Sequence, residues 1–338
     1  MIKIYLPIFL LISFVFIISI SFLYEEEIVV ENISGSVMGT TYSINLQIDN
    51  PANIESSIVN IFSNVNEEMS TYIEGSMISR VNKSVIGEWT SVNEDFIEVL
   101  AYATTLCLKT NGVYDVTIGK IVDSWGFGPE EVTEKPKKID LRYFQDQIGC
   151  NSIEFDQEKF LVKKLKDIAL DFSSIAKGFA IDKAFLFLEN EEKIKSFMVE
   201  LGGEIRTTSL KPDRKAWKVG VINPLNPSTF IHIFYSDNHE SFAMATSGDY
   251  MNIRIFNDEK YSHTIDSNTL PSEFNKKSVS VISTNAMKAD AIATALNAME
   301  LNQAIIFADK NNIKALFVIE ENNEAKLIFS KELQKVKI

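Results

Sequence analysis

Hydrophobic and polar positions repeat along this chain with two different periods. Over 41–48 the apolar side chains alternate with polar ones, which predicts a half-buried strand. Over 51–69 they recur every three or four residues, which predicts a helix with one buried face. The same spacing over 93–110 predicts another helix, which Asn111–Gly112 should end because both residues tolerate a left-handed backbone. The two helices flank a short segment, Ser70–Ile73.

A strand, a turn and a helix follow one another at residues 169–182. Asp171 stands at the end of the strand, and Ser173 or Ser174 is predicted to be the helix N-cap, because a hydroxyl can accept a hydrogen bond from an unpaired helix N–H. Free N–H groups, the helix dipole and the charge of Lys177 would meet at this helix start. The place would suit a phosphate group, although the pattern by itself is more typical of an ordinary capped helix.

The same arrangement occurs again at residues 278–299, where an apolar strand is followed by Thr284 or Asn285 as the predicted N-cap of an alanine-rich helix. Asp290 and Thr294 are four residues apart, so on a helix their side chains share one face. A carboxylate, a hydroxyl and a backbone carbonyl can together bind one hard cation through oxygen. Taken alone, the pair is more typical of a solvated helix face.

The rest of the chain contains mainly predicted strands. They are expected at 197–206, where two glycines produce a kink, at 217–224 and at 230–235. Residues 243–254 and 260–266 are predicted to form the two halves of a hairpin. The sequence therefore predicts an α+β fold with an antiparallel sheet core flanked by helices.

Two further segments contain side chains that could serve a site. Residues 125–129, Trp-Gly-Phe-Gly-Pro, combine aromatic rings with flexible backbone, which could form either a pocket wall or core packing and a turn. His263 lies between a tyrosine-serine pair and Asp266 in a polar strand. A single histidine in a strand is usually structural, so the pattern alone does not make it catalytic.

The first 24 residues are predicted to be a membrane anchor. Lys3 precedes an uncharged run of about twenty apolar residues, which is long enough to span a bilayer and has its positive charge on the side that stays inside. No small-residue cleavage site and no lipid-attachment cysteine follow it, which favours an uncleaved anchor over a removed signal peptide or a buried core helix. After a short linker, 25–33, the domain at 34–338 is expected on the extracytoplasmic side of the cell membrane.

Charge and cysteine content narrow the possible partners of this domain. The chain has 338 residues and a formal net charge of -13, which argues against binding to nucleic acid. Any bound polyphosphate would therefore depend on a cation or on a local positive pocket. Cys107 and Cys150 have no metal-ligand spacing, but they could form one disulfide in an oxidising compartment.

Nine motifs occur in the order found in one enzyme family, and on these motifs the sequence resembles the ApbE family, whose members are FAD:protein FMN transferases. The resemblance extends from about position 34 to position 329. The motifs are Met38-Gly-Thr40, Ser70-Thr-Tyr72, Tyr114–Gly119, Trp125–Pro129, Leu170–Gly178, Glu200–Gly203, Ala245–Tyr250, Tyr261–Asp266 and Ala289–Leu296.

The resemblance implies an activity. The protein is expected to cleave FAD with Mg²⁺, to transfer the FMN half to a Thr or Ser hydroxyl of an exported or membrane redox protein, and to release AMP. It is also expected to have two interlocked lobes, with the flavin in the cleft between them. The alternatives are a magnesium-dependent FAD pyrophosphatase that gives FMN and AMP, and a noncatalytic FAD-binding protein of the cell surface.

The resemblance also assigns roles residue by residue. Asp290, Thr294 and the backbone of Ser174 would hold the metal. His263 matches the proposed catalytic histidine and could accept the proton of the client hydroxyl, unless an aspartate of the same pocket does so. The residues expected to contact FAD are Met38, Tyr72, Val113, Tyr114, Asp115, Asp171 and Lys177.

Overall fold

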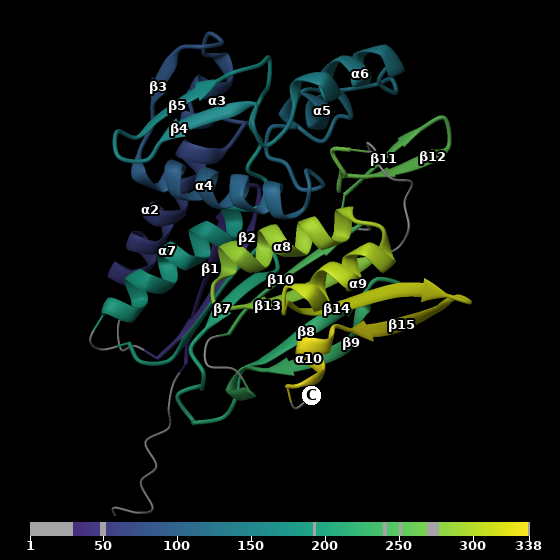
Figure 1. The fold of residues 1–338 in the computed structure, drawn as a ribbon. Coiled ribbons are helices and arrows are strands. Elements are labelled where there is room, and N and C mark those ends of the chain that lie inside the picture. Colours follow the sequence, from purple (N-terminus) through teal and green to yellow (C-terminus); the bar gives the residue numbers. More distant parts are fainter. Residues whose placement is uncertain are drawn as a thin grey trace, which may run out of the picture.

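A computed structural model describes residues 30–47, 52–191, 194–238, 242–249, 252–268 and 277–336 of the chain. Its centre is an eight-stranded antiparallel sheet with the strand order β1-β2-β6-β7-β10-β13-β14-β15 (Figure 1). The predicted α+β fold with an antiparallel core is therefore confirmed. The strands of this sheet are β1 (Glu31–Val37), β2 (Thr40–Leu46), β6 (Phe197–Leu201), β7 (Glu204–Thr207), β10 (Phe242–Gly248), β13 (Ser278–Ser283), β14 (Lys314–Glu321) and β15 (Glu324–Phe329).

Strand β2 shows how the period of two places side chains. Tyr42, Ile44 and Leu46 are buried, whereas the polar residues between them are half-buried. The buried side chains belong to the largest core cluster, together with Ile58 and Phe62 from the apolar face of helix α2 (Ala52–Met69). The two periodicities read from the sequence thus meet in one core.

Neighbouring residues of the inner strands face opposite sides of the sheet. Val281 and Phe317 pack with residues of helices α8 (Ala286–Ala298) and α9 (Leu301–Lys310). Ile282 and Leu316 pack instead with residues of the hairpin β8 (Lys218–Asn223) and β9 (Asn226–Tyr235) and of α10 (Lys331–Gln334). A short 3-10 helix, Ser236–Asn238, follows β9. The main sheet is therefore covered on both faces.

A second group of elements, which includes α4, lies beside the main sheet, in the upper part of Figure 1. It includes a small antiparallel sheet of order β3-β5-β4, and an apolar cluster in which Trp125 packs against Phe256 and Tyr261. The elements are α3 (Met77–Lys83), β3 (Trp89–Ser91), α4 (Glu94–Lys109), α5 (Gly119–Ser124), α6 (Lys138–Gln147), β4 (Ile153–Asp156), β5 (Leu161–Lys164), β11 (Ile253–Phe256) and β12 (Glu259–Ser262).

Cys107 and Cys150 form a disulfide. Cys107 lies in α4, and Cys150 follows α6, so the bond joins two segments that are 43 residues apart in the sequence. A cross-link over a loop of this length restricts the unfolded chain and thereby stabilises the fold. The pairing that the sequence left open is thus present.

The predicted hairpin of residues 243–254 and 260–266 is only partly present. Its outer part exists, because β11 pairs with β12. Residues 242–248, however, form the inner strand β10 of the main sheet, between β7 and β13. Nearly every residue of β10 is buried, as expected for a strand covered on both faces, and its polar Thr246 hydrogen-bonds to Ser280 across the sheet. Local sequence could not distinguish this strand from a hairpin arm.

The predicted membrane anchor, residues 1–24, lies outside the described residues. In the part of the chain that the structure describes, no helix is both long enough and apolar enough to cross a bilayer. The first strand begins at Glu31, within the segment predicted as a linker.

Candidate active site

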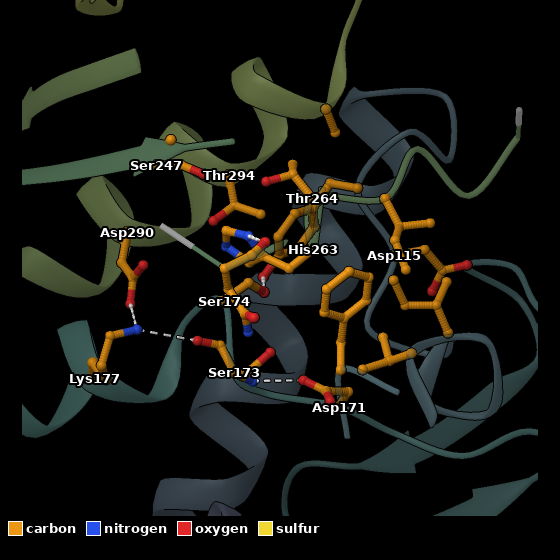
Figure 2. A pocket seen from close by; sticks show the side chains of 18 of the residues that line it. Asp115, Asp171, Ser173, Ser174, Lys177, Ser247, His263, Thr264, Asp290 and Thr294 are labelled. Carbon is orange, nitrogen blue, oxygen red and sulfur yellow. Dashed lines mark hydrogen bonds and ion pairs between the residues drawn. The ribbon is translucent and has the colours of Figure 1, made fainter. Parts of the chain in front are cut away.

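A cavity of about 320 Å³ opens between the main sheet and the second group of elements (Figure 2). Its volume is within the range of about 300–1,000 Å³ that small-molecule sites occupy. Every residue that the sequence assigns to the site lines this cavity, with the exception of Met38. These residues are Tyr72, Val113, Tyr114, Asp115, Asp171, Ser174, Lys177, His263, Asp290 and Thr294.

Met38 lies near the cavity but does not line it. It occupies the turn between β1 and β2 with a positive φ of 53°, and it packs half-buried against the main core. The turn is close to the cavity, because Gly202, which lines the cavity, donates its N–H to the carbonyl of Thr41 at 3.0 Å. The structure thus uses the Met38 side chain for packing.

The end of α4 brings residues 113–115 to the cavity. Asn111 and Gly112 have positive φ angles of 53° and 83°, which ends the helix where the sequence predicts. The hydroxyl of Tyr114 then lies 3.0 Å from Oγ of Ser174. This contact joins the segment after α4 to the segment before α7 (Ala176–Asn190).

The serine N-cap predicted for this helix is absent. Helix α7 begins at Ala176, and Ile175 in the N-cap position makes no side-chain capping bond. The N–H of Ser173 donates instead to Oδ1 of Asp171 at 2.7 Å, which closes an Asx turn before the helix. The prediction that Ser173 or Ser174 caps the helix is therefore wrong, because the turn delays the helix start until Ala176.

A carboxylate of the protein itself occupies the first turn of α7. The N–H of Gly178 donates to Oδ2 of Asp290 at 3.1 Å. Helices α7 and α8 approach closely enough for this contact because Gly178 has no side chain: a Cβ atom there would lie 2.4 Å from the carbonyl oxygen of Ala286. The positive N-terminal end of α7 thus holds the Asp290 carboxylate in place through the Gly178 N–H.

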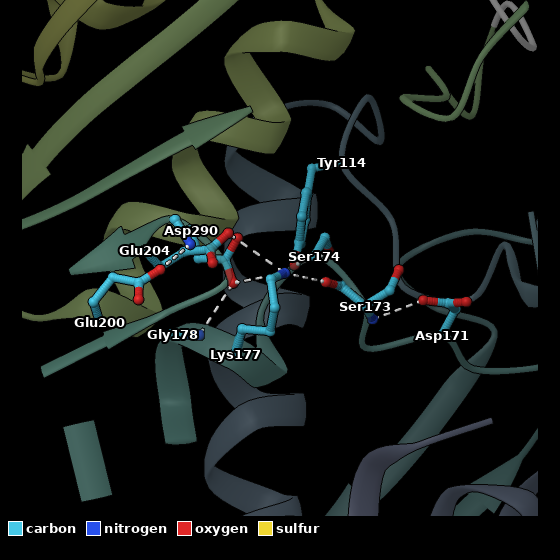
Figure 3. A network of polar contacts seen from close by, with 10 residues as sticks. Tyr114, Asp171, Ser173, Ser174, Lys177, Gly178, Glu200, Glu204 and Asp290 are labelled. Atoms are coloured by element: carbon cyan, nitrogen blue, oxygen red, sulfur yellow. Dashed lines mark hydrogen bonds and ion pairs between the residues drawn. The ribbon is translucent and has the colours of Figure 1, made fainter. Parts of the chain in front are cut away.

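Lys177 is placed between two buried carboxylates (Figure 3). Its Nζ lies 3.4 Å from Oε1 of Glu204 and 3.9 Å from Oδ2 of Asp290. It also donates to the carbonyl of Ser173 at 3.2 Å. Two acids and one base therefore share a site from which most water is excluded.

Burial and charge shift the pKa values of this cluster in different directions. Burial raises the pKa of Asp290, against the opposing effects of Lys177 and the N–H of Gly178. It also raises the pKa of Glu204, again against the opposing effect of Lys177. Burial alone would lower the pKa of Lys177, but the two carboxylates outweigh it and raise that pKa. Lys177 consequently keeps its positive charge at neutral pH.

The residues present fit a hard divalent cation. Asp290 and Thr294 lie on the cavity side of α8, with Ser174 across the cavity, so carboxylate, hydroxyl and carbonyl oxygens are all available. Within the described ranges, no three His, Cys, Asp or Glu side chains gather as a metal site. Mg²⁺ typically binds through one or two carboxylates, waters and substrate phosphates. A single protein carboxylate is therefore appropriate if the substrate carries phosphate.

His263 lies just beyond β12, half-buried at the cavity beside the ring of Phe127. Its Nδ1 is 3.2 Å from the carbonyl of Asn252, which can only accept a hydrogen bond, so Nδ1 carries the proton and Nε2 is free to accept one. Burial lowers the pKa of His263; the bond to Asn252 opposes this change, and the charge of Lys177 adds to it. The ring is thus neutral at neutral pH.

Several residues that line the cavity were not identified from the sequence, and Glu204 is the charged one among them. Glu204 follows the glycine pair noted as a strand kink, and its carboxylate lies inside the cavity wall. Phe127 also lines the cavity, whereas Trp125 is buried in the core. In the Trp-Gly-Phe-Gly-Pro segment, the pocket-wall interpretation is therefore correct for Phe127 and the core-packing interpretation for Trp125. The glycine pair was the only local signal for Glu204.

Comparisons with known proteins agree with the family resemblance inferred from the sequence motifs. A sequence model described as "ApbE family" matches residues 38–317. A Haemophilus influenzae protein named "FAD:protein FMN transferase" is 33% identical over 311 residues, which cover 88% of this chain and 89% of that protein. A Vibrio cholerae protein of the same name is 32% identical over 300 residues, which cover 86% and 88% of the two chains.

Solved structures of similar proteins have the same fold. A mutant form of the flavin transferase ApbE from Vibrio cholerae superposes with a TM-score of 0.81 at 31% identity, covering 91% of this chain and 100% of that one. The apo form of the Pseudomonas stutzeri flavinyl transferase ApbE also gives a TM-score of 0.81, at 26% identity, with 91% and 96% covered.

Proposed function

The chain belongs to the ApbE family and is an FAD:protein FMN transferase, and on that premise we propose how its cavity carries out the transfer. The observation that supports the proposal is the convergence of Lys177, Asp290 and His263 on one cavity from three distant segments. These side chains offer a fixed positive charge, a ligand for a cation and a neutral base. Phosphoryl transfer asks a protein mainly for positioning and charge neutralisation.

We propose that the acceptor is a Thr or Ser hydroxyl of an exported or membrane redox protein. Its oxygen attacks the phosphorus on the FMN side of the FAD pyrophosphate. The bond from that phosphorus to the bridging oxygen breaks, and AMP leaves with that oxygen. Nε2 of His263 takes the hydroxyl proton, because this nitrogen is unprotonated in the tautomer that the Asn252 carbonyl selects.

A magnesium ion is the cation that we propose for Asp290, Thr294 and the backbone of Ser174. When bound, it would neutralise charge on the phosphate oxygens and hold the two phosphates of FAD in a fixed orientation. The protein's own contribution is to fix these donors: α8 positions the Asp290 and Thr294 side chains one helical turn apart, and Gly178 holds the Asp290 carboxylate. Lys177 adds a fixed charge beside them.

Two alternatives use the same cavity. A pyrophosphatase would deliver the phosphorus to water, and a noncatalytic flavin-binding protein would need neither His263 nor the Asp290 and Thr294 pair. The cavity contains all three of these residues, which favours catalysis. His263 is also only half-buried, so a protein hydroxyl can approach it.

Mass spectrometry can test whether FMN is transferred to a protein hydroxyl or to water. The domain from position 30 onward, which includes all of β1, is mixed with FAD, Mg²⁺ and a redox-protein fragment that carries an acceptor threonine. We expect the fragment to gain the mass of one FMN, because a pocket that positions a hydroxyl gives it an advantage over water. The same fragment with Thr replaced by Ala is the control. Free FMN with an unmodified fragment would indicate the pyrophosphatase, and intact FAD would indicate the binding protein.

We also propose that residues 1–24 anchor the enzyme to the cell membrane, with the domain on the extracytoplasmic side. The apolar run led by Lys3 supports this placement. The disulfide between Cys107 and Cys150 supports it independently, because such bonds persist in oxidising compartments.

The anchor predicts how the full chain fractionates. Because an apolar span remains in the bilayer when ionic contacts are removed, the protein should stay in membranes after high-salt and alkaline washing. Immunoblotting of the pellet and the supernatant measures this, with a variant that begins at position 30 as the soluble control. Recovery of a soluble form that starts near Glu25 would show instead that the segment is cleaved.

A further inference from the structure

Glu204 is a buried acid for which the reaction described above has no role. It begins β7 directly after the turn Gly202–Gly203, and it is 6% exposed. Its Oε1 lies 3.4 Å from Nζ of Lys177, while its Oε2 is buried without a hydrogen-bond partner. A buried carboxyl group with one oxygen left unpaired is costly, so the position of Glu204 requires an explanation.

The turn before Glu204 leaves room for the contact between the Glu204 carboxylate and Lys177. Gly202 has a φ of +66°, and a Cβ atom there would lie 3.2 Å from Cδ of Lys177 and 3.3 Å from Oε2 of Glu204. A side chain at this position would crowd both partners, as well as Thr40, whose Cγ2 would lie 3.0 Å away. The glycine allows the ion pair to form under the backbone of the turn.

Lys177 has a second carboxylate within reach. Asp290 lies 3.9 Å from Nζ of Lys177, and its Oδ2 already accepts the N–H of Gly178. If Lys177 paired with Asp290 alone, the ammonium would neutralise the carboxylate whose negative charge attracts a cation. The distance from Nζ of Lys177 to Glu204 is shorter than that to Asp290. The ammonium therefore lies closer to β7 than to the carboxylate on α8.

We propose that Glu204 is a positioning residue that draws the Lys177 ammonium away from Asp290 and so leaves Asp290 able to bind the divalent cation. This inference rests on the proposed function, in which Asp290 is the metal ligand. Once the cation is bound, Asp290 no longer balances the charge of Lys177, and the cation and the ammonium repel each other. Glu204 then becomes the carboxylate that keeps Lys177 beside the site.

Direct binding of Mn²⁺ in the presence of FAD, whose phosphates supply the remaining ligands, tests this role without an assay of transfer. Mn²⁺ prefers the same oxygen ligands as Mg²⁺, and the free ion can be counted by its EPR signal. In Glu204→Gln the ammonium should move onto Asp290, so we expect the Kd for Mn²⁺ to rise by about 10-fold or more, as for other partners of metal ligands. Glu200→Gln is the matched control, because Glu200 accepts the Gly203 N–H beside the same turn and does not line the cavity.

A double-mutant cycle separates action through Lys177 from direct action on the cation. In a Lys177→Met background the ammonium is gone, so Glu204→Gln should change the Kd for Mn²⁺ by less than about 3-fold if coupling runs through the lysine. An equal loss in both backgrounds would overturn the proposal, because Glu204 would then act on the cation itself. An unchanged Kd in the single variant would also overturn it.

Two further measurements keep the result unambiguous. Thermal melting shows whether each variant is folded; if Glu204→Gln is not, Glu204→Asp replaces it, since the shorter acid also withdraws from Lys177 and should give the same weakening. Asp290→Asn tests the premise. If the wild-type protein binds Mn²⁺ no better than Asp290→Asn does, the proposed metal site is wrong. If binding is lost in Asp290→Asn but unchanged in Glu204→Gln, the metal site stands and only the proposed role of Glu204 is rejected.

Discussion

The Asp290→Asn variant is expected to lose FMN transfer almost completely, with kcat lower by about 10³-fold or more. Asn keeps the size of the side chain and an oxygen that can accept the Gly178 N–H, but it removes the negative charge that attracts the cation. The loss should therefore appear in turnover and in the dependence of turnover on Mg²⁺. Both are measured by AMP release at a series of Mg²⁺ concentrations.

FAD should still bind to Asp290→Asn, because most of the residues that line the cavity are unchanged. Quenching of flavin fluorescence gives its Kd, which we expect to change by less than about 10-fold. Asp309→Asn is a suitable control, because Asp309 lies on α9 outside the cavity wall and pairs with Lys331. Undiminished turnover in Asp290→Asn would remove Asp290 from the site.

Replacement of His263 by Gln is expected to lower kcat/KM by about 10²- to 10⁴-fold, which is the usual contribution of a general base. The Gln amide can still donate to the carbonyl of Asn252, but it cannot accept a proton at neutral pH. The acceptor hydroxyl would then have to lose its proton to water. Transfer to the threonine-bearing fragment, followed by mass spectrometry, measures the loss.

The pH profile tests the same residue by a different route. Burial lowers the pKa of His263 from the ordinary value of about 6.5. Because a base works only when it is unprotonated, wild-type kcat/KM should rise with pH through an apparent pKa below about 6.5 and then level off. The His263→Gln variant should lack this rise.

His232→Gln is the matched control for both measurements. His232 lies on β9 and packs against Phe234 and Phe329, on the sheet face that contains neither α7 nor α8. This variant should keep both the rate and the acidic limb of the profile. Persistence of that limb in His263→Gln would assign the proton transfer to another group of the cavity.

Local signals in the sequence were sufficient wherever the structure is set by neighbours in the chain. The alternation around Ile44, the helix end at Asn111–Gly112 and the side-chain cap of Asn285 on α8 are all present as predicted. Each depends on contacts between residues a few positions apart. The class of fold followed from such elements, and the order of nine motifs indicated the family.

Local signals failed where a competing local or tertiary contact decided the outcome. A serine near the start of α7 satisfies every local rule for an N-cap, yet Asp171 takes the N–H of Ser173 and the helix starts later. Residues 242–248 became an inner strand because β7 and β13 pair with both edges, which no pattern inside the segment could indicate.

The sequence by itself determined the class of fold, the family and ten of the residues that line the cavity, because these depend on short segments and on their order along the chain. Only the tertiary structure brought Lys177, Glu204 and Asp290 together, from α7, β7 and α8, within 3.4 Å and 3.9 Å of one ammonium. It also set their pKa values, because burial and opposite charge depend on neighbours in space. The shared ammonium could therefore be recognised only in the folded chain.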